Sequence, residues 1–182
     1  MLKSIVDFCR LIVGSLFIVS GLIKANDALG FMYKLEEYFE PGALNWTWLS
    51  DYALEMAIFI CVGEILLGVA MVLGALPRLT AVLTGLMMAV FTWLTWYTAN
   101  CDPFGSKMIT DAMGTLVEIP NQCVLACGCF GNAIPLTPYE SFIKDVVLSI
   151  LTVPILWGAF TDKIELNSKR LGRILIPASL LM

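Results

Sequence analysis

The sequence predicts an all-α membrane protein: a four-helix transmembrane bundle with an amphipathic surface helix and a cysteine-containing outer loop. Of its 182 residues, 59% are hydrophobic and only 14% are charged, and apolar stretches long enough to cross a bilayer recur four times. The chain has a net charge of −4, no histidine and no basic run. Nucleic acid and histidine-ligated metals are therefore not expected as partners, whereas the lipid bilayer is.

The first span is predicted at residues 5–24, which are long enough to cross about 30 Å of hydrocarbon. The apolar run ends in Lys24-Ala25-Asn26-Asp27 without a small-x-small cleavage site, so this span is expected to stay in the protein. One face carries glycines and charges at helical spacing: Arg10, Gly14, Gly21 and Lys24. This face is expected to pack closely against a neighbouring helix and to keep its charges near the two ends.

Residues 28–39 mix apolar and charged side chains and are too polar to span a membrane. The segment closes at Pro41-Gly42, and its pattern predicts an amphipathic helix that lies at the membrane surface. Trp46, Trp48 and Tyr52 follow it. They are expected to anchor the chain at the membrane–water interface.

Three further spans are predicted at residues 53–75, 77–98 and 142–160, and a tight turn at Leu76 makes the first two of them an antiparallel hairpin. Side chains with many hydroxyls among them follow a helical stripe on two of these spans. The third span carries Thr80, Thr84, Met88, Phe91, Thr95 and Thr98, and the fourth carries Asp145, Ser149 and Thr152. Both stripes are expected to face the bundle interior, where hydroxyls bond across helices or to their own carbonyls.

The distribution of basic residues predicts the orientation. With the amino terminus in the cytoplasm, seven lysines and arginines lie inside and four outside, as the positive-inside rule favours. In a bacterial inner membrane the loop of residues 99–141 is then periplasmic, and its cysteines face an oxidising compartment. Within the loop, residues 107–122 show no clear period, and Thr110 could cap a short helix.

The chain divides into a bundle at residues 1–160 and a tail at residues 161–182. The tail has a basic segment at residues 163–173, expected in the cytoplasm, and then apolar residues 174–182, which are too few to cross a membrane. These last residues are expected to begin a fifth span in a longer natural chain. A native mass near 20.0 kDa would contradict that expectation.

Four of the six cysteines lie in the outer loop: Cys101, Cys123, Cys127 and Cys129. They permit three complete pairings, among which the sequence does not choose. Two disulfides would staple the loop to its helices. Alternatively, a Cys127–Cys129 disulfide would close a strained ring that exchanges readily, with Cys101 and Cys123 as a second pair that relays electrons. A zinc site is a third alternative, although the paired C-x₂-C spacing of zinc ribbons is missing.

Glu64 is a candidate site residue because it lies about 16 Å into the second span, near the bilayer centre. An acid at this depth either has a function or is paired, for example with a threonine of the third span. Arg10 and Lys24 lie nearer helix ends, where they can snorkel, and are expected to be poorer partners. Cys9 and Cys61 are expected to be small buried packing residues.

Lys144 and Asp145 open the fourth span and are the last candidates. Asp145 in the first turn suits the helix dipole. If the loop folds back over the bundle, Lys144 could lower the pKa of a Cys127 or Cys129 thiol and favour the thiolate. Because adjacent residues point apart on a helix, Lys144 and Asp145 are not expected to contact each other.

Several motifs resemble those of a known family. They are Gly21-Leu22-Ile23-Lys24 followed by Asp27, Gly30-Phe31 and Lys34; Glu64-Ile65-Leu66-Leu67-Gly68; and the turn from Gly74 to Arg78. Together they resemble the DoxX family of four-helix bacterial membrane proteins. Cys127-Gly128-Cys129-Phe130-Gly131 followed by Lys144-Asp145 is similar to its MauE-like branch, and the likeness covers nearly all of residues 1–160.

The resemblance implies an inner-membrane protein associated with redox work. DoxX relatives are linked to thiosulfate and quinone oxidoreduction, and MauE is implicated in maturing a disulfide-rich periplasmic enzyme. The leading hypothesis is thiol–disulfide electron transfer between a periplasmic or membrane protein partner and a quinone, with exchange at Cys127 and Cys129 and proton handling at Glu64. The alternatives are a non-catalytic structural subunit with passive disulfides and a small-molecule carrier that uses Glu64.

Overall fold

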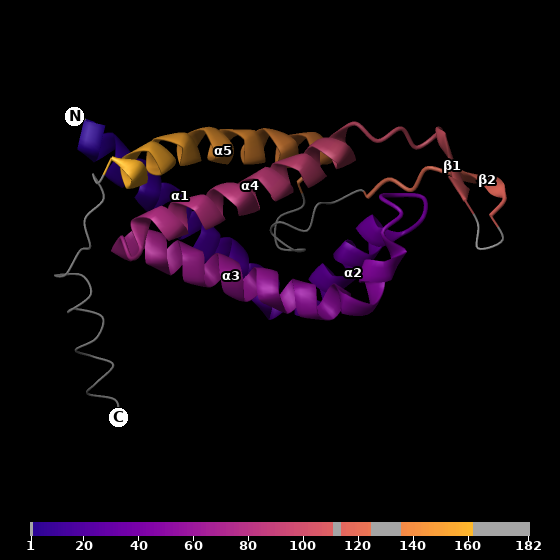
Figure 1. Ribbon diagram of the computed structural model, residues 1–182, viewed down its shortest axis with the longest axis horizontal. Helices are drawn as coiled ribbons and strands as arrows, with labels where there is room; N and C mark the ends of the chain where they lie inside the picture. The colour runs from indigo at the N-terminus through magenta and orange to yellow at the C-terminus, as the bar shows by residue number, and fades with distance from the viewer. Residues whose placement is uncertain (1, 111–113, 125–135, 162–182) are drawn as a thin grey trace, which may run out of the picture.

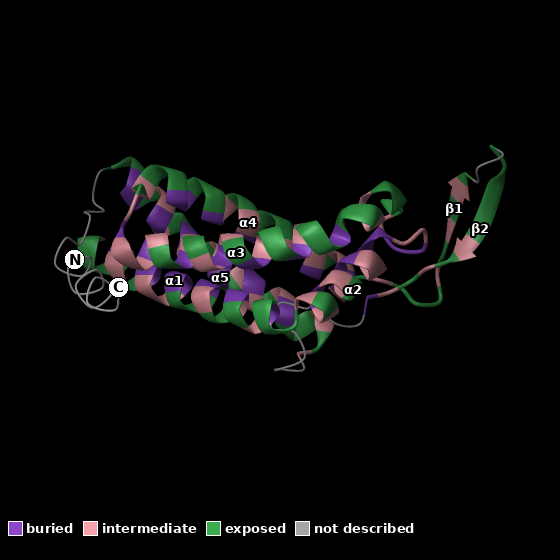
Figure 2. Cartoon of the chain, turned by 90° about the horizontal axis from the view of Figure 1, so that it is seen from below, coloured by how far each residue is buried: buried purple, intermediate pink, exposed green. Residues whose placement is uncertain are grey.

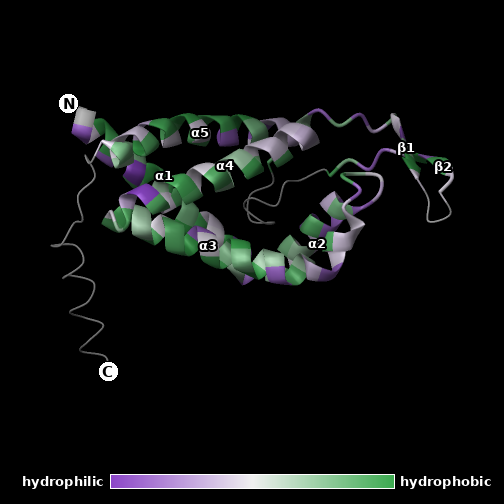
Figure 3. Ribbon diagram, viewed as in Figure 1, coloured by the Kyte–Doolittle hydropathy of each residue, from purple (hydrophilic) through white to green (hydrophobic). Residues whose placement is uncertain are grey.

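Four long helices dominate the computed structural model, which describes residues 2–110, 114–124 and 136–161. They are α1 (Leu2–Asn26), α3 (Ala53–Leu73), α4 (Pro77–Ala99) and α5 (Pro138–Phe160), and each is long and apolar enough to cross a membrane. They form one elongated bundle in which α1 packs against α3 and α5, and α4 packs against α5 and α3. Figure 3 shows hydrophobic residues along most of α3 and α5. The predicted four-span bundle is confirmed.

The amino terminus and the end of α5 lie at the same end of the bundle (Figure 1). The short turn between α3 and α4 lies there too, where Gly74 (φ 76°) and Leu76 (φ 43°) adopt left-handed conformations. The opposite end, called the loop end here, carries the other short elements: α2 (Ala28–Phe39), the 3₁₀ helix η1 (Thr47–Tyr52), and the strands β1 (Ser106–Thr110) and β2 (Leu116–Pro120).

The amphipathic helix is confirmed as α2, with the predicted bounds. Asp27 caps it, since its side chain accepts a hydrogen bond from the Gly30 amide at 2.9 Å. Its buried residues are Phe31, Leu35, Tyr38 and Phe39, and they form a core cluster with α3 residues Ala53, Ala57 and Cys61. The apolar face of α2 is therefore covered by the bundle's own helix α3.

Residues 107–122 form an antiparallel hairpin, so the expectation of a short helix capped by Thr110 is wrong. Thr110 ends β1 and pairs with Leu116 of β2. Lys107, Ile109, Val117 and Ile119 share one face and Met108 and Glu118 the other, which is the two-residue alternation of a strand. Each strand has only five residues, too few for that alternation to stand out in the sequence.

The core has two apolar clusters. One contains Val6, Val13 and Phe17 of α1 with Met71 of α3, Met88 of α4 and Ile155 of α5, and the other is the cluster between α2 and α3. Figure 2 shows buried residues on the inward faces of the helices and exposed residues on the outward faces. The exposed residues include large apolar side chains such as Phe59 and Leu66, as expected for helices surrounded by lipid.

The predicted tail lies outside the part of the chain that the structure describes, apart from Thr161. The expectations of a basic cytoplasmic segment at residues 163–173 and of a fifth span from residue 174 therefore remain predictions. Cys127 and Cys129 also lie outside the described residues.

Candidate functional site

A buried ion pair joins α1 and α3. The Lys24 ammonium donates a hydrogen bond to Oε1 of Glu64 at 2.5 Å and another to the Ser20 hydroxyl at 3.0 Å. Lys24 is 1% exposed and Glu64 is 2% exposed. The ammonium also lies 5.3 Å from the ring centroid of Phe31 and 4.8 Å from that of Phe91. Two aromatic faces and a carboxylate thus replace the water that a lysine normally requires.

The expectation that Lys24 is a poor partner for Glu64 is wrong. Side chains on a helix lean toward its amino terminus, so the Lys24 side chain leans inward from the end of α1. On the antiparallel α3, the same rule makes the Glu64 side chain lean toward the loop end. Gly21 allows α1 to approach α3 closely at this level. Its Cα lies so near α3 that an added Cβ would be 3.1 Å from the Glu64 Cβ.

A second buried carboxylate lies on α5. Asp145 is 2% exposed; its Oδ2 accepts a hydrogen bond from Thr95 of α4 at 3.1 Å, and its Oδ1 pairs with the Lys144 ammonium at 3.0 Å. Lys144 and Asp145 therefore do contact each other, against expectation, because the long lysine side chain folds back over its neighbour.

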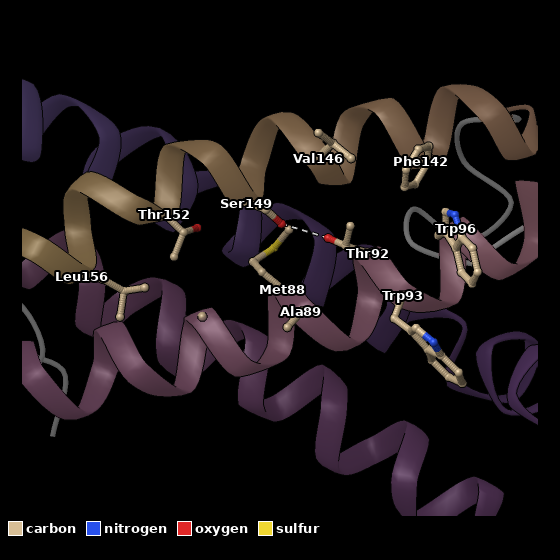
Figure 4. Close-up of a pocket in the computed structure, with 11 residues that line it drawn as sticks. Met88, Ala89, Thr92, Trp93, Trp96, Phe142, Val146, Ser149, Thr152 and Leu156 are labelled. Atoms are coloured by element: carbon tan, nitrogen blue, oxygen red, sulfur yellow. Dashed lines mark hydrogen bonds between the residues drawn. The ribbon is translucent and has the colours of Figure 1, made fainter.

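The predicted polar stripes of the third and fourth spans do face the interior. Thr80, Thr84, Met88, Thr95 and Thr98 are buried on α4, and Asp145 and Thr152 are buried on α5. Several of the hydroxyls bond as expected: Thr98 and Thr152 donate to carbonyls four residues earlier in their own helices, and Thr92 bonds across to Ser149 at 2.8 Å. Figure 4 shows that last bond between α4 and α5, beside a groove of about 490 Å³. The buried Thr84 hydroxyl has no such partner among the described residues.

Lys24, Glu64, Thr95 and Asp145 form what we call the polar layer, one residue from each long helix. Along α3, Glu64 lies between Cys61 of one core cluster and Met71 of the other. Along α5, Asp145 comes before Leu148, the first residue of that helix in the core. The polar layer thus lies toward the loop end of the bundle, between the two apolar clusters of the core.

Cys101 and Cys123 form a disulfide, with their Cα atoms 5.7 Å apart. It joins the end of α4 to the residues after β2, and so it closes the base of the hairpin. Asn121 reinforces this base, since its amide donates to the Gly105 carbonyl at 2.9 Å and its side chain donates to the Asp102 carbonyl at 3.0 Å. Of the expected pairs, Cys101 with Cys123 is therefore present.

The disulfide contradicts the zinc alternative, because two of the four sulfurs that it requires are bonded to each other. Among residues 2–110, 114–124 and 136–161, no group of three His, Cys, Asp or Glu side chains is placed to hold a metal ion. Cys9 and Cys61 are buried free thiols, as expected.

The structure brings Glu64, Lys144 and Asp145 into one region and places the Cys101–Cys123 disulfide beyond them at the loop end. Sequence reasoning missed Lys24, Phe31 and Phe91 as parts of the site. The signal for Lys24 was present, since it shares a helix face with Gly21 and that face was predicted to pack closely against a neighbour.

A family model described as methylamine utilisation protein MauE matches residues 2–103. The match covers more than half of the chain, from α1 through α4, and includes both partners of the Lys24–Glu64 pair. The loop cysteines Cys123, Cys127 and Cys129 lie beyond it. No curated protein and no solved structure matches the chain.

Proposed function

This chain belongs to the MauE family of membrane proteins, and we propose that it serves methylamine utilisation by exchanging disulfides with a protein outside the membrane. In this proposal the membrane is a bacterial inner membrane, the amino terminus is cytoplasmic and the loop end is periplasmic. The observation that carries the proposal is the Cys101–Cys123 disulfide, which shares a loop with Cys127 and Cys129 and lies at the same end of the bundle as the polar layer.

The proposed reaction is an exchange at Cys127 and Cys129. A thiolate of the partner attacks their disulfide, a mixed disulfide forms, and the second thiol of the partner resolves it. The partner's two thiols become a disulfide, while Cys127 and Cys129 become two thiols. Cys101 and Cys123 relay the two electrons or remain a staple.

A membrane quinone accepts the two electrons and two protons in this proposal. It becomes a quinol, and the Cys127–Cys129 disulfide forms again. Lys144 favours the thiolate by its positive charge. Glu64 handles protons, because its pairing with Lys24 supplies a carboxylate and an ammonium between which a proton can be shared.

A structural subunit is the second candidate, and one specific observation favours it. The Cys101–Cys123 disulfide closes a hydrogen-bonded hairpin, and the Gln122 amide next to it donates to the Gly42 carbonyl at 2.9 Å. A disulfide within such a framework stabilises the loop without any exchange. In this role the loop end would dock a partner protein passively.

Two double variants separate the candidates. Cys127→Ser with Cys129→Ser should abolish growth on methylamine and leave the partner's thiols unoxidised, while the protein remains at its normal level in the membrane. Cys101→Ser with Cys123→Ser serves as the comparison and should lower the level of folded protein. If the Cys127/Cys129 variant grows normally and its partner is fully oxidised, the exchange role is wrong and the structural role is favoured.

A further inference from the structure

A cavity of about 270 Å³ lies between α2, η1, α3 and α4, separate from the groove of Figure 4. Aromatic side chains from two helices and from the residue before η1 surround it. They are Phe31, Tyr38 and Phe39 of α2, Trp46 next to η1, and Phe91 and Trp93 of α4. Aliphatic side chains and Met56 make up most of the rest of the lining: Leu35, Leu49, Met56, Ile60, Val90 and Leu94.

The polar side chains on the lining already have partners inside the protein. The Lys34 ammonium bonds both carboxylate oxygens of Glu37, at 2.6 and 2.9 Å. The Tyr38 hydroxyl bonds Thr98 at 2.7 Å, and the Thr95 hydroxyl donates to Asp145. An occupant therefore has little to offer these groups by hydrogen bonding, and its recognition must come from shape and from stacking on aromatic faces.

Trp46 and Trp93 both line the cavity and reach the surface of the bundle. Their rings stack with centroids 5.8 Å apart and planes 18° apart, and they are 40% and 41% exposed. Both belong to a part of the bundle that is rich in exposed tryptophan, together with Trp48 and Trp96. Tryptophan concentrates at membrane–water interfaces, so an occupant of the cavity would enter from the lipid at that level.

We propose that this cavity binds a planar, lipid-soluble ring compound of about two fused rings. A cavity of about 150 Å³ lined by apolar side chains can hold benzene, so about 270 Å³ has room for a ring system of about twice that size. Six aromatic lining residues favour a flat ring over a flexible acyl chain, because offset and edge-to-face ring contacts add to the energy of apolar burial.

Two residues that line the cavity also contact the Lys24 ammonium of the Lys24–Glu64 pair. Phe31 and Phe91 line the cavity, and the Lys24 ammonium lies over both rings. A bound ring would hold these two phenyl groups in place around the ammonium. The proposal goes beyond disulfide exchange, because Cys101 and Cys123, the loop cysteines that the structure describes, do not line the cavity.

Tryptophan fluorescence quenching tests the proposal on the whole protein in lipid nanodiscs. The probe is 2,3-dimethyl-1,4-naphthoquinone, whose substituted ring does not add thiols. Quenching should saturate at one probe per protein.

Ile60→Phe with Leu94→Phe, which adds rings to the lining, should weaken binding at least tenfold. Ile58→Phe with Leu86→Phe is the matched control, since both positions face outward on the same helices, and should bind as the unchanged protein does.

Competition identifies the class of ligand. Redox-inert 2-methylnaphthalene should displace the probe, and palmitate should not. The proposal would be overturned if the unchanged protein and the two double variants bind the probe equally well, or if quenching rises without saturation. Displacement of the probe by palmitate alone would also overturn it, because the cavity would then bind an acyl chain. Leu49→Phe, which fills the cavity from η1, gives an independent variant and should also weaken binding while the Cys101–Cys123 disulfide stays intact.

Discussion

The bundle tolerates Lys24 and Glu64 in its interior only as a pair. Each is almost fully buried in a protein surrounded by hydrocarbon, where an unpaired charge is expensive. The two aromatic contacts and the Ser20 hydroxyl leave the ammonium well surrounded. The pair therefore adds little net stability by itself, yet each partner makes the other necessary.

Replacing Lys24 with methionine should lower the free energy of unfolding by about 3–5 kcal/mol, because the Glu64 carboxylate is left buried and unpaired. The measurement is thermal or denaturant unfolding in detergent. Lys34→Met is the control, since the Lys34–Glu37 pair is partly exposed and its loss should cost less than about 1 kcal/mol.

The double variant Lys24→Met with Glu64→Leu removes both charges and keeps apolar volume, so it should recover most of the lost stability. If the double variant is as unstable as Lys24→Met alone, the unpaired Glu64 carboxylate is not the cause of the lost stability. The conclusion that Lys24 and Glu64 require each other would then be wrong.

At the scale of the elements, the contact between α1 and α3 sets the register that brings this pair together. Gly14 and Gly68 allow the two backbones to approach so closely that a Cβ on Gly68 would lie 2.6 Å from the Gly14 carbonyl oxygen. Glycines in membrane helices commonly allow such approach. Since two of the three nearest atoms, the Gly14 carbonyl oxygen and the Ile18 amide nitrogen, belong to backbone, a rotamer change cannot make room for a side chain at Gly68.

Gly68→Ala should therefore push α1 and α3 apart and destabilise the bundle by about 1–3 kcal/mol. Gly63→Ala is the matched control on the same helix, because among the described residues its added Cβ would meet only the Met87 terminal methyl, at 3.5 Å. Alanine there should be neutral or stabilising. The thermal unfolding midpoints of the two variants give the comparison. Equal midpoints would show that the close contact does not hold the helices in register.

Helix existence and helix faces could be predicted from the sequence, because an apolar run and a 3.6-residue period are local properties. The polar stripe through Thr95 and the amphipathic helix at residues 28–39 are examples. The partner of Glu64 could not be predicted, because it depends on the axial register of α1 against α3. The hairpin was missed because β1 and β2 are too short to show a period, and only the folded loop shows that Cys101 meets Cys123.

At the scale of the whole molecule, the groups that the proposed function uses gather toward one of the two ends of the bundle. The termini of the helical bundle and the α3–α4 turn lie at one end, and α2, the hairpin and the disulfide lie at the other (Figure 1). The polar layer and the aromatic cavity both lie toward the second end. This distribution is what a protein would need if it carries out thiol exchange on one side of a membrane with an acceptor dissolved in the lipid.

The most direct measurement of the proposed exchange is the redox state of the loop cysteines in the membrane. Spheroplasts are alkylated rapidly with a membrane-impermeant maleimide, and the peptides are mapped by mass. We expect Cys127 and Cys129 to be partly reduced, to be labelled from outside, to become more reduced on adding a dithiol and to be reoxidised on adding a quinone. Complete locking of both in disulfides, with no change on either addition, would contradict the proposed function.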